Sequence, residues 1–355
     1  MTKEEKIIYS PPVGIAHILN SVLDLFRIEL EDKDYRKVII NTSSQPNSNP
    51  HLGTIVTIFT TFCLAQAIQE KYNIEVSVQF DELENSPYES FDHDGVKYSK
   101  SLEFVSDEGM SFADRYMLNY FDIFDYCMKK SRVKYKVRTY REFQSSTIVR
   151  ETVKRIISKS SFFTQKYNGL HIRIPCRKCG IVDKKSRQIQ FLSNNSIVFC
   201  CPFHGETIAS IDNGDYIDLN TPLRDLTKSI EFMENEDVLI IMCDGNDWSG
   251  AWDRHVNIEC LFELGYPKKN INKRIFSPMI VDWSGAKLSK SLYIDNKEYL
   301  NAYNNFLNYE KFMDVYGNDG LDLLWNEVLS WIETPSKFFR NYSIQYFKEL
   351  FKHIE

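Results

Sequence analysis

The segment Lys37-Val-Ile-Ile-Asn-Thr-Ser-Ser-Gln-Pro46-Asn-Ser-Asn-Pro50-His51-Leu-Gly53-Thr54 changes character along its length. It begins with a β-branched run at 37–41, which predicts a strand, and continues with a Pro-, Asn- and Ser-rich stretch, which predicts a turn. Apolar residues at helical spacing follow at 54–72, and a second strand is predicted at 74–80. Strand, polar turn, helix and strand in this order are typical of a parallel βαβ unit, so the sequence predicts an α/β fold.

The rest of the chain extends this pattern. Helices are predicted at 12–31 and 252–264, a mainly helical region at 110–160 around a basic strand at 133–139, and further strands at 238–242 and 275–281. We expect a Rossmann-like parallel sheet core with a metal-binding insertion and a short C-terminal helical region. The expected boundaries are 1–150 for an N-terminal helix and the first half of the core, 151–230 for the insertion with a small module at 171–212, 231–295 for the second half, and 296–355 for the helical region.

Composition narrows the class of protein. The chain has 355 residues, of which 43% are hydrophobic and 26% are charged, which suits two or three packed domains and excludes a disordered composition. No apolar run reaches the roughly 20 residues of a membrane span, and the N-terminus has no apolar stretch of signal-peptide type. We therefore expect a cytoplasmic protein with no membrane partner.

The net charge of −6 argues against a large nucleic-acid footprint and leaves room for a local basic patch. One such patch is the run 129–141, which has seven basic residues and no acidic one. Its period-two alternation favours a half-exposed strand, and a track for the phosphates of a nucleic acid is the alternative.

The loop 46–54 has the features of a phosphate site. It lies between a strand and a helix, where the helix amides attract anions, and Gly53 permits close approach of a nucleotide. The imidazole of His51 can donate a hydrogen bond to a phosphate oxygen as charge develops. Taken alone, the loop is equally well explained as an ordinary helix-capping turn.

A second loop favours the phosphate site over the helix-capping turn. Ser284-Gly-Ala-Lys287-Leu-Ser289-Lys290-Ser291 follows the strand predicted at 275–281 and carries two lysines three residues apart. Two mobile cations can hold a triphosphate, and the serines add hydroxyl donors. A solvated basic loop is the alternative, but the occurrence of both loops after strands favours nucleotide binding.

Four residues predict a metal site. Cys176-Arg-Lys-Cys179 and Cys201-Pro-Phe-His204 are two paired knuckles whose spacing matches a tetrahedral structural Zn²⁺ site. Cys200 is a competing candidate for the fourth ligand position. The alternative to a metal site is that these cysteines are free and have their spacing by chance. The remaining cysteines lie in apolar stretches and are expected to be buried small hydrophobes; they are Cys63, Cys127, Cys243 and Cys260.

Carboxylates follow two of the predicted strands, at the sheet edge where ligands bind. After 238–242, Asp247 can accept a hydrogen bond from a ribose hydroxyl or a substrate ammonium, and Trp248 or Trp252 can form a pocket wall. Asp244 and Trp252 are better explained as a helix cap and a core aromatic, whereas His255 is evenly balanced. After 74–80, Asp81, Glu82 and Glu84 could recognise a cationic side chain, although a solvated turn is favoured.

The two loops carry a resemblance to a known family. His51-Leu-Gly53-Thr54 resembles the first signature of class I aminoacyl-tRNA synthetases, usually written HIGH, and Lys287-Leu-Ser-Lys-Ser291 resembles the second, KMSKS. The lead-in 46–50 also fits, and the resemblance covers about residues 35–295. Thr54 replaces the final His of the first signature.

The resemblance implies an enzyme that uses ATP and Mg²⁺ to activate an amino acid as an aminoacyl-adenylate, for transfer to a tRNA acceptor end or another acceptor. It implies catalytic roles for His51, Lys287 and Lys290. It implies ATP contacts from Pro50, Gly53, Thr54, Gly245, Asp247, Ser289 and Ser291, and amino-acid contacts from Thr42, Ser43, Asp81, Trp248 and His255.

Within this class the chain looks most like the class I lysyl-tRNA synthetases, which makes lysine a candidate substrate. The shared features are a cysteine-rich zinc module between the two halves, a first signature ending in Thr and an acidic segment like 80–84. The stretch after Ser291 is too short for a full anticodon-binding domain. We therefore expect one of three activities: charging through the acceptor end alone, aminoacyl transfer in small-molecule biosynthesis, or ligand binding without catalysis. Nucleotidylyltransferases with an HxGH loop are a more distant alternative.

Overall fold

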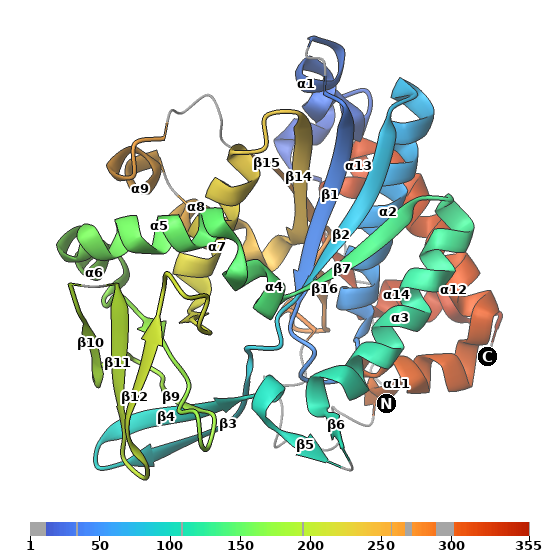
Figure 1. The fold of residues 1–355 in the computed structure, drawn as a ribbon. Coiled ribbons are helices and arrows are strands. Elements are labelled where there is room, and N and C mark those ends of the chain that lie inside the picture. The colour runs from blue at the N-terminus through green and yellow to red at the C-terminus, as the bar shows by residue number, and fades with distance from the viewer. Residues whose placement is uncertain are drawn as a thin grey trace.

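The computed structural model describes residues 12–32, 35–107, 109–193, 195–256, 258–266, 272–288 and 302–354. Its centre is a five-stranded sheet in the order β15-β14-β1-β2-β7 with every pair parallel (Figure 1). The strands are β1 (Lys37–Ser44), β2 (Glu75–Glu82), β7 (Lys134–Thr139), β14 (Val238–Gly245) and β15 (Lys273–Ser277). The chain winds from β1 out through β2 to β7 and then restarts at β14 on the other side of β1. This reversal between β1 and β14 is the switch point of a Rossmann-like sheet and confirms the predicted fold class.

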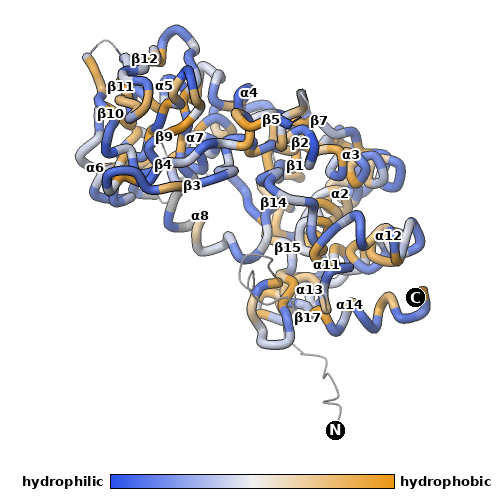
Figure 2. The backbone as a smooth tube through the Cα atoms, turned by 90° about the horizontal axis from the view of Figure 1, so that it is seen from below, coloured by the Kyte–Doolittle hydropathy of each residue, from blue (hydrophilic) through white to orange (hydrophobic). Residues whose placement is uncertain are grey.

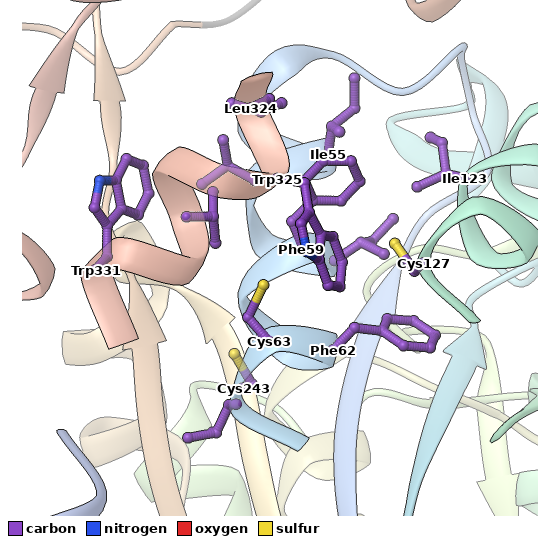
Figure 3. Close-up of a cluster of buried hydrophobic side chains, with 14 of the residues drawn as sticks. Ile55, Phe59, Phe62, Cys63, Ile123, Cys127, Cys243, Leu324, Trp325 and Trp331 are labelled. Atoms are coloured by element: carbon purple, nitrogen blue, oxygen red, sulfur yellow. The ribbon is translucent and has the colours of Figure 1, made fainter. Parts of the chain in front are cut away.

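Helix α2 (Leu52–Tyr72) fills the centre of one sheet face. His51 caps its first turn, and Asn73, in the left-handed conformation, ends it. By length and composition this helix also meets the criteria for a membrane span, which the sequence analysis did not expect, but 67% of its most apolar window is buried inside the structure. Figure 3 shows its Phe59, Phe62 and Cys63 among buried side chains from the sheet and from other helices. Helix α2 is therefore the core helix of this fold.

The helices form two layers, one on each face of the sheet (Figure 1). The α2 face also carries α3 (Phe112–Ser131) and the C-terminal helices α11 (Asn304–Leu307), α12 (Tyr309–Glu333), α13 (Pro335–Phe338) and α14 (Ile344–Phe351). The opposite face carries α5 (Thr147–Ser158), α6 (Ser160–Tyr167), α7 (Thr221–Met233), α8 (Ser249–His255) and α9 (Ile258–Glu263). Side chains of β14 alternate between the two cores, as the period of a strand requires.

A second, mostly antiparallel part lies beyond the edge of the sheet. It contains β3 (Pro87–His93), β4 (Val96–Ser101), β8 (Ile172–Arg173), β9 (Ile181–Asp183), β10 (Ile189–Phe191), β11 (Ser196–Cys201), β12 (Gly205–Ser210) and β13 (Asp218–Leu219). Strand β9 pairs with β4, which ties the cysteine-rich module to the β3–β4 hairpin. Figure 2 shows β10–β12 and the C-terminal helices at opposite ends of the molecule, with the sheet between them.

Short elements complete the description. They are η1 (Gly14–His17), η2 (Val22–Phe26), α1 (Arg27–Asp32), η3 (Leu102–Phe104), β5 (Ser106–Asp107), β6 (Met110–Ser111), α4 (Tyr140–Ser145), η4 (Asn246–Trp248), β16 (Ile280–Val281) and β17 (Tyr342–Ser343). The single helix predicted at 12–31 is therefore wrong, because Ser21 caps a new turn in its middle. The helix predicted at 252–264 divides into α8 and α9. The strand predicted at 275–281 divides into β15 and β16, and β16 pairs with β17 instead of the main sheet.

The cysteines and the basic run behave as their pattern predicted. Cys63, Cys127, Cys243 and Cys260 are buried, and each belongs to one of the two hydrophobic cores. Strand β7 lies at the sheet edge with Lys134 and Lys136 exposed, so the middle of the run 129–141 forms the expected half-exposed strand, whereas its ends belong to α3 and α4.

Candidate functional site

A cavity of about 330 Å³ opens at the carboxyl ends of β1 and β14, at the switch point of the sheet. Its walls come from the loop after β1, the first turns of α2, the start of α7, the segment after β14 and the loop after β16. The lining residues include Thr42, Ser43, His51, Gly53, Thr54, Thr57, Arg224, Asp225, Asp244, Gly245, Asp247, Trp248, Trp252 and Lys287. Open α/β sheets bind ligands at this position.

The first turn of α2 fixes the imidazole of His51. His51 Nδ1 accepts a hydrogen bond from the Thr54 amide at 3.3 Å. The ring lies against residue 53, where a Cβ atom would be 3.0 Å from His51 Cε1. Glycine at position 53 therefore leaves room for the imidazole, which a larger residue would shift by a few tenths of an ångström. In the neutral ring, acceptance at Nδ1 places the proton on Nε2, so His51 can donate a hydrogen bond from that atom.

Three side-chain hydrogen bonds hold the His51 loop and helix α2 to distant elements. Thr57 Oγ1 lies 2.7 Å from Ser277 Oγ at the end of β15. Asn49 donates to Asn308, the N-cap of α12, at 3.2 Å, and accepts from Asn119 of α3 at 3.0 Å. The loop is therefore fixed by the C-terminal helices as well as by the sheet.

Gly245 ends β14 in an extended conformation and leads directly into η4. A Cβ atom there would lie 2.6 Å from Asp247 Oδ1, so only glycine allows the carboxylate this position. Trp248 is partly exposed and Trp252 is buried, and both line the cavity. Asp244 lines it too and has no capping role, because no side chain caps η4 or α8. The expectation that Asp244 is a helix cap is therefore wrong, whereas Trp252 belongs to the hydrophobic core, as expected, and also lines the cavity.

Burial controls the protonation of Asp244. It raises the pKa of this carboxyl from 3.8 to about 6, and the nearby carboxylate of Asp225 acts in the same direction. Lys228, Arg224 and a hydrogen bond from Trp252 act in the opposite direction. Asp244 is thus ionised at neutral pH and becomes neutral in mild acid.

Lys287 reaches the cavity from a tight turn. Asp282 Oδ1 accepts from the Ser284 amide at 2.8 Å and from the Ala286 amide at 3.2 Å, and this turn returns the chain so that Val281 and Lys287 pair. Lys287 Nζ lies 2.5 Å from Asp247 Oδ2. Two predicted ligand residues from separate loops thus form one ion pair at the cavity wall.

Two buried charges at the start of α7 were missed by the sequence analysis. Arg224 and Asp225 are buried, line the cavity and lie 3.8 Å apart. Adjacent charges of opposite sign in the first turns of a helix were the available signal. The cavity wall thus combines carboxylates and cations, which suits a zwitterionic or phosphorylated ligand.

Asp81 belongs to the interior and not to the cavity. Its carboxylate accepts from Arg138 Nε at 2.8 Å, from Asn41 at 3.1 Å, and lies 3.4 Å from Lys228 Nζ. Burial alone would raise the pKa of Asp81, but Arg138 and Lys228 outweigh it and lower the pKa to about 2. The solvated turn favoured for Asp81 is therefore wrong, because Asp81 is buried in β2, and its paired charge also argues against the alternative, recognition of a cationic substrate. Arg138 also pairs with Glu231, so it is not part of an exposed phosphate track.

Glu84, in the same acidic segment, has a capping role. Its carboxylate accepts from the Tyr140 amide at 2.7 Å and from the Arg141 amide at 2.8 Å, at the start of α4. Burial raises the pKa of Glu84 to about 7.

The predicted site residues therefore divide into three groups. Thr42, Ser43, His51, Gly53, Thr54, Gly245, Asp247, Trp248 and Lys287 line one cavity. Pro50 is buried just before His51 and, like Asp81, is not among the described lining residues. Ser289, Lys290 and Ser291 lie outside the described residues, as does the side chain of His255.

The four predicted metal ligands meet in the insertion. Cys176 and Cys179 lie in the turn between β8 and β9, Cys201 ends β11, and His204 lies in the turn before β12. Their ligand atoms all lie within 4.8 Å of one another. Cys179 and Cys201 Sγ are 3.8 Å apart, and His204 Nδ1 is 3.6 Å from the Sγ atoms of Cys176 and Cys201. Tetrahedral ligands at about 2.3 Å from Zn²⁺ would be separated by about this much, so the donor set fits Zn²⁺.

Cys200 is excluded from this cluster by the strand that carries it. Successive side chains of a strand point to opposite faces, so the buried Cys201 turns inward and Cys200 is exposed. The choice between the two cysteines, which the sequence left open, is settled in favour of Cys201. All four ligand positions are filled by protein, which is the arrangement of a structural site.

Comparisons with known proteins give limited similarity. No protein-family model matches the chain, and no curated protein matches it. Among solved structures, a glutamate-tRNA synthetase from Elizabethkingia anophelis matches with a TM-score of 0.40 and 10% identity over 89% of this chain and 70% of that chain. The arginyl-tRNA synthetase of Thermus thermophilus matches with a TM-score of 0.33 and 12% identity over 95% of this chain and 65% of that chain. Similarity at this level does not establish an activity, which has to follow from the residues of the site.

Proposed function

We propose that this chain activates an amino acid with ATP, yielding an aminoacyl-adenylate and pyrophosphate, in the manner of a class I aminoacyl-tRNA synthetase. One observation carries the proposal: His51 of the first signature-like loop and Lys287 of the second line the same cavity at the switch point of a parallel sheet. Most of the chain separates these residues in sequence. Two short motifs that match by chance have no reason to meet in one cavity.

In the proposed reaction, a carboxylate oxygen of the amino acid attacks the α-phosphorus of ATP, and the bond from that phosphorus to the pyrophosphate oxygen breaks. The side chains form no covalent bond, so the contribution of the protein is positioning and charge stabilisation. His51 donates from Nε2 to a phosphate oxygen beside the N-terminus of α2. Mg²⁺ enters with the triphosphate as part of the substrate.

Asp247 and Lys287 are proposed to act on opposite ends of the nucleotide. Asp247 accepts a hydrogen bond from a ribose hydroxyl, and Lys287 turns from Asp247 to the phosphates, where it stabilises the negative charge of the leaving pyrophosphate. Their ion pair holds both side chains at the cavity wall before ATP binds. Lys290 is proposed to assist Lys287, as the resemblance implies.

The amino acid is proposed to bind near β1 and α7. Asp225 and Asp244 are buried carboxylates of the cavity wall that can receive its ammonium group, and Thr42 and Ser43 lie at the adjacent end of β1. Lysine is the first amino acid to test, because the chain resembles the lysyl enzymes in sequence. The acceptor is a tRNA acceptor end or another carrier, and we place the reaction in the cytoplasm.

The zinc module is proposed to be structural. Its ligands cluster in the insertion and none of them lines the cavity, so the metal would stabilise the insertion without taking part in the chemistry.

The test is ATP–pyrophosphate exchange with each proteinogenic amino acid, with and without tRNA. We expect exchange that depends on one amino acid or a small related group. Exchange with a nucleotidyl acceptor and no amino acid would identify a nucleotidylyltransferase instead. ATP binding without any exchange would identify a ligand-binding relative and contradict the proposal.

A further inference from the structure

Helix α7 contains a buried lysine, Lys228, to which the proposed reaction gives no role. Only 3% of the residue is exposed, and it is not among the described lining residues of the cavity at the switch point. Its Nζ atom lies 3.5 Å from Ser43 Oγ at the end of β1 and 3.4 Å from Asp81 Oδ2 in β2. Because Ser43 lines the cavity, the ammonium group of Lys228 lies directly behind the cavity wall.

The contact with Asp81 does not by itself explain why this residue is a lysine. Arg138 already binds both carboxylate oxygens of Asp81, at 2.8 and 3.0 Å, so this buried carboxylate has a partner without Lys228. A further buried cation adds a desolvation cost, and an apolar side chain of similar volume would fill the same space without it. The reason for a cation at this position therefore lies in its contacts with the cavity wall.

Lys228 reaches that wall through Trp252 of α8. Its Nζ atom lies 5.7 Å from the centre of the indole ring, within the range of a cation–π interaction, and Arg274 of β15 lies 5.1 Å from the same ring. Trp252 in turn donates a hydrogen bond to the carboxylate of Asp244. Both Trp252 and Asp244 line the cavity, so the lysine supports two wall residues that come from separate elements.

The charge of Lys228 also acts on Asp244. Burial raises the pKa of Asp244 to about 6, and the ammonium group of Lys228 opposes this rise more than any other neighbouring group. Asp225 acts in the same direction as burial, whereas Arg224 acts with Lys228. The charged and titratable groups that share the cavity wall with Asp244 are His51, Arg224, Asp225, Asp247 and Lys287. Loss of the lysine would therefore move the ionisation of Asp244 to a higher pH.

We propose that Lys228 is a positioning residue of the amino-acid site, which acts through Trp252 and Asp244 and does not touch the substrate. The inference rests on the proposed function, in which Asp244 can receive the ammonium group of the amino acid. Asp81, on the other side of Lys228, balances the charge of the lysine. The lysine can therefore support the carboxylate of Asp244 while its repulsion of the substrate ammonium is reduced.

The charge of Asp244 can be measured without any substrate. In protein labelled with isotope-enriched aspartate, NMR follows the carboxyl signal of Asp244, which is assigned by its absence from Asp244→Asn. The wild-type signal should titrate at about 6. In Lys228→Met, which keeps the length of the side chain and removes its charge, the signal should titrate about one pH unit higher or more. Lys228→Arg restores a cation and should return the titration towards the wild-type value.

A second neutral variant separates charge from contact. In Lys228→Gln the amide can still donate to Ser43 and Asp81 but has no charge, so it should shift the Asp244 titration as Lys228→Met does. It also provides the measurement if Lys228→Met does not fold. The matched control is Lys154→Met, which removes a lysine that pairs with Glu151 and Asp212 and does not line the cavity. Thermal melting checks that each variant is folded.

Pyrophosphate exchange gives a readout that a purely structural role would not produce. If the titration of Asp244 moves up by about one unit, the KM for the amino acid should rise about threefold at about pH 6.5 and approach the wild-type value at about pH 8.5. The kcat should change less than KM, because the lysine acts on binding. A loss of packing alone would instead raise KM by the same factor at every pH.

An Asp244 signal that titrates at the wild-type value in both neutral variants would overturn the inference, and so would a KM that rises equally at all pH values. Exchange without a shift of Asp244 would contradict only this inference. A shift of Asp244 without exchange for any amino acid would contradict the proposed function and leave Lys228 as the residue that keeps Asp244 charged.

Discussion

Lys287 Nζ lies 2.5 Å from Asp247 Oδ2, so the loop after β16 and the segment after β14 are joined by an ion pair at the cavity wall. Each residue is a candidate contact to a different part of ATP. In this arrangement the carboxylate of Asp247 neutralises the ammonium group of Lys287, which a triphosphate would otherwise attract. In the proposed reaction, ATP binding requires this pair to separate, and the pair sets the starting position of both side chains.

The first prediction concerns this pair. Lys287→Gln and Asp247→Asn should each weaken ATP binding, and their effects should not add in the double variant, because each single change already breaks the pair. Both side chains are partly exposed, so we expect a coupling of about 0.2–1 kcal/mol. Calorimetric titration with ATP measures it. Additive effects would show that the pair has no energetic role.

The second prediction concerns the rate of the reaction. Lys287→Ala should slow pyrophosphate exchange by about 10²–10³-fold, the usual loss for one electrostatic contact to developing charge. Amino-acid affinity should change little, because the lysine acts on the leaving group. Lys311→Ala is the control, since this exposed lysine pairs with Asp314 on α12. Unchanged exchange in Lys287→Ala would remove this loop from the mechanism.

The third prediction concerns the metal. Purified protein without a tag should contain about one zinc per chain by elemental analysis, because three thiolates and one imidazole complete a tetrahedral set. Cys179→Ser should lose zinc and lower the melting temperature, while ATP binding is partly retained. Cys200→Ser should keep the metal, since Cys200 is exposed on the opposite face of β11. Zinc loss in the Cys200 variant, or its absence from wild type, would contradict the assignment.

The fourth prediction concerns pH. Because the pKa of Asp244 is raised to about 6, this carboxyl loses its charge as the pH falls through that value, and its attraction for a substrate ammonium decreases. The KM for the amino acid should therefore be higher at pH 5 than at pH 7.5. Asp244→Asn should raise KM at pH 7.5 and flatten this dependence. A variant that keeps the wild-type profile would assign the titration to another group.

The fifth prediction concerns stability. The pKa of Asp81 falls from 3.8 in its ordinary state to about 2 in the fold, so its ion pairs stabilise the protein above pH 4 by about 2 kcal/mol. This contribution is lost as the pH falls through 2. Asp81→Asn should destabilise the chain at pH 7 by about 3–5 kcal/mol, because Arg138 and Lys228 lose a buried partner.

Urea unfolding at pH 7 measures this loss, with Asp92→Asn on the exposed face of β3 as the control. Equal midpoints for the two variants would show that Asp81 is not the partner that holds Arg138 and Lys228.

The sequence predicted correctly those helices and strands whose side chains follow a regular local pattern. The β-branched run at 37–41 is part of β1, the apolar spacing at 54–72 forms α2, and the alternation at 133–139 forms β7. The end of an element was not predicted where a single side chain interrupts a periodic pattern. Ser21 does this by capping a turn inside the region 12–31. Periodicity detects which face is apolar and is blind to such a single hydrogen bond.

The residues of the candidate site also divide into those that local sequence predicts and those that it does not. Sequence alone determined the residues whose chemistry depends on near neighbours: His51 beside Gly53, and the knuckle pairs Cys176–Cys179 and Cys201–His204. These geometries are set within a few peptide units, so spacing is sufficient to recognise them.

Tertiary structure alone decided which distant charges meet. Asp81 lies near the end of β2 and Asp247 follows β14, yet Asp81 pairs with Arg138 in the interior, whereas Asp247 pairs with Lys287 at the cavity. Strand order and register determine which of these charges come into contact, and both depend on how the whole chain packs. A charge therefore acquires its partner, its pKa and its role only when the sheet is assembled.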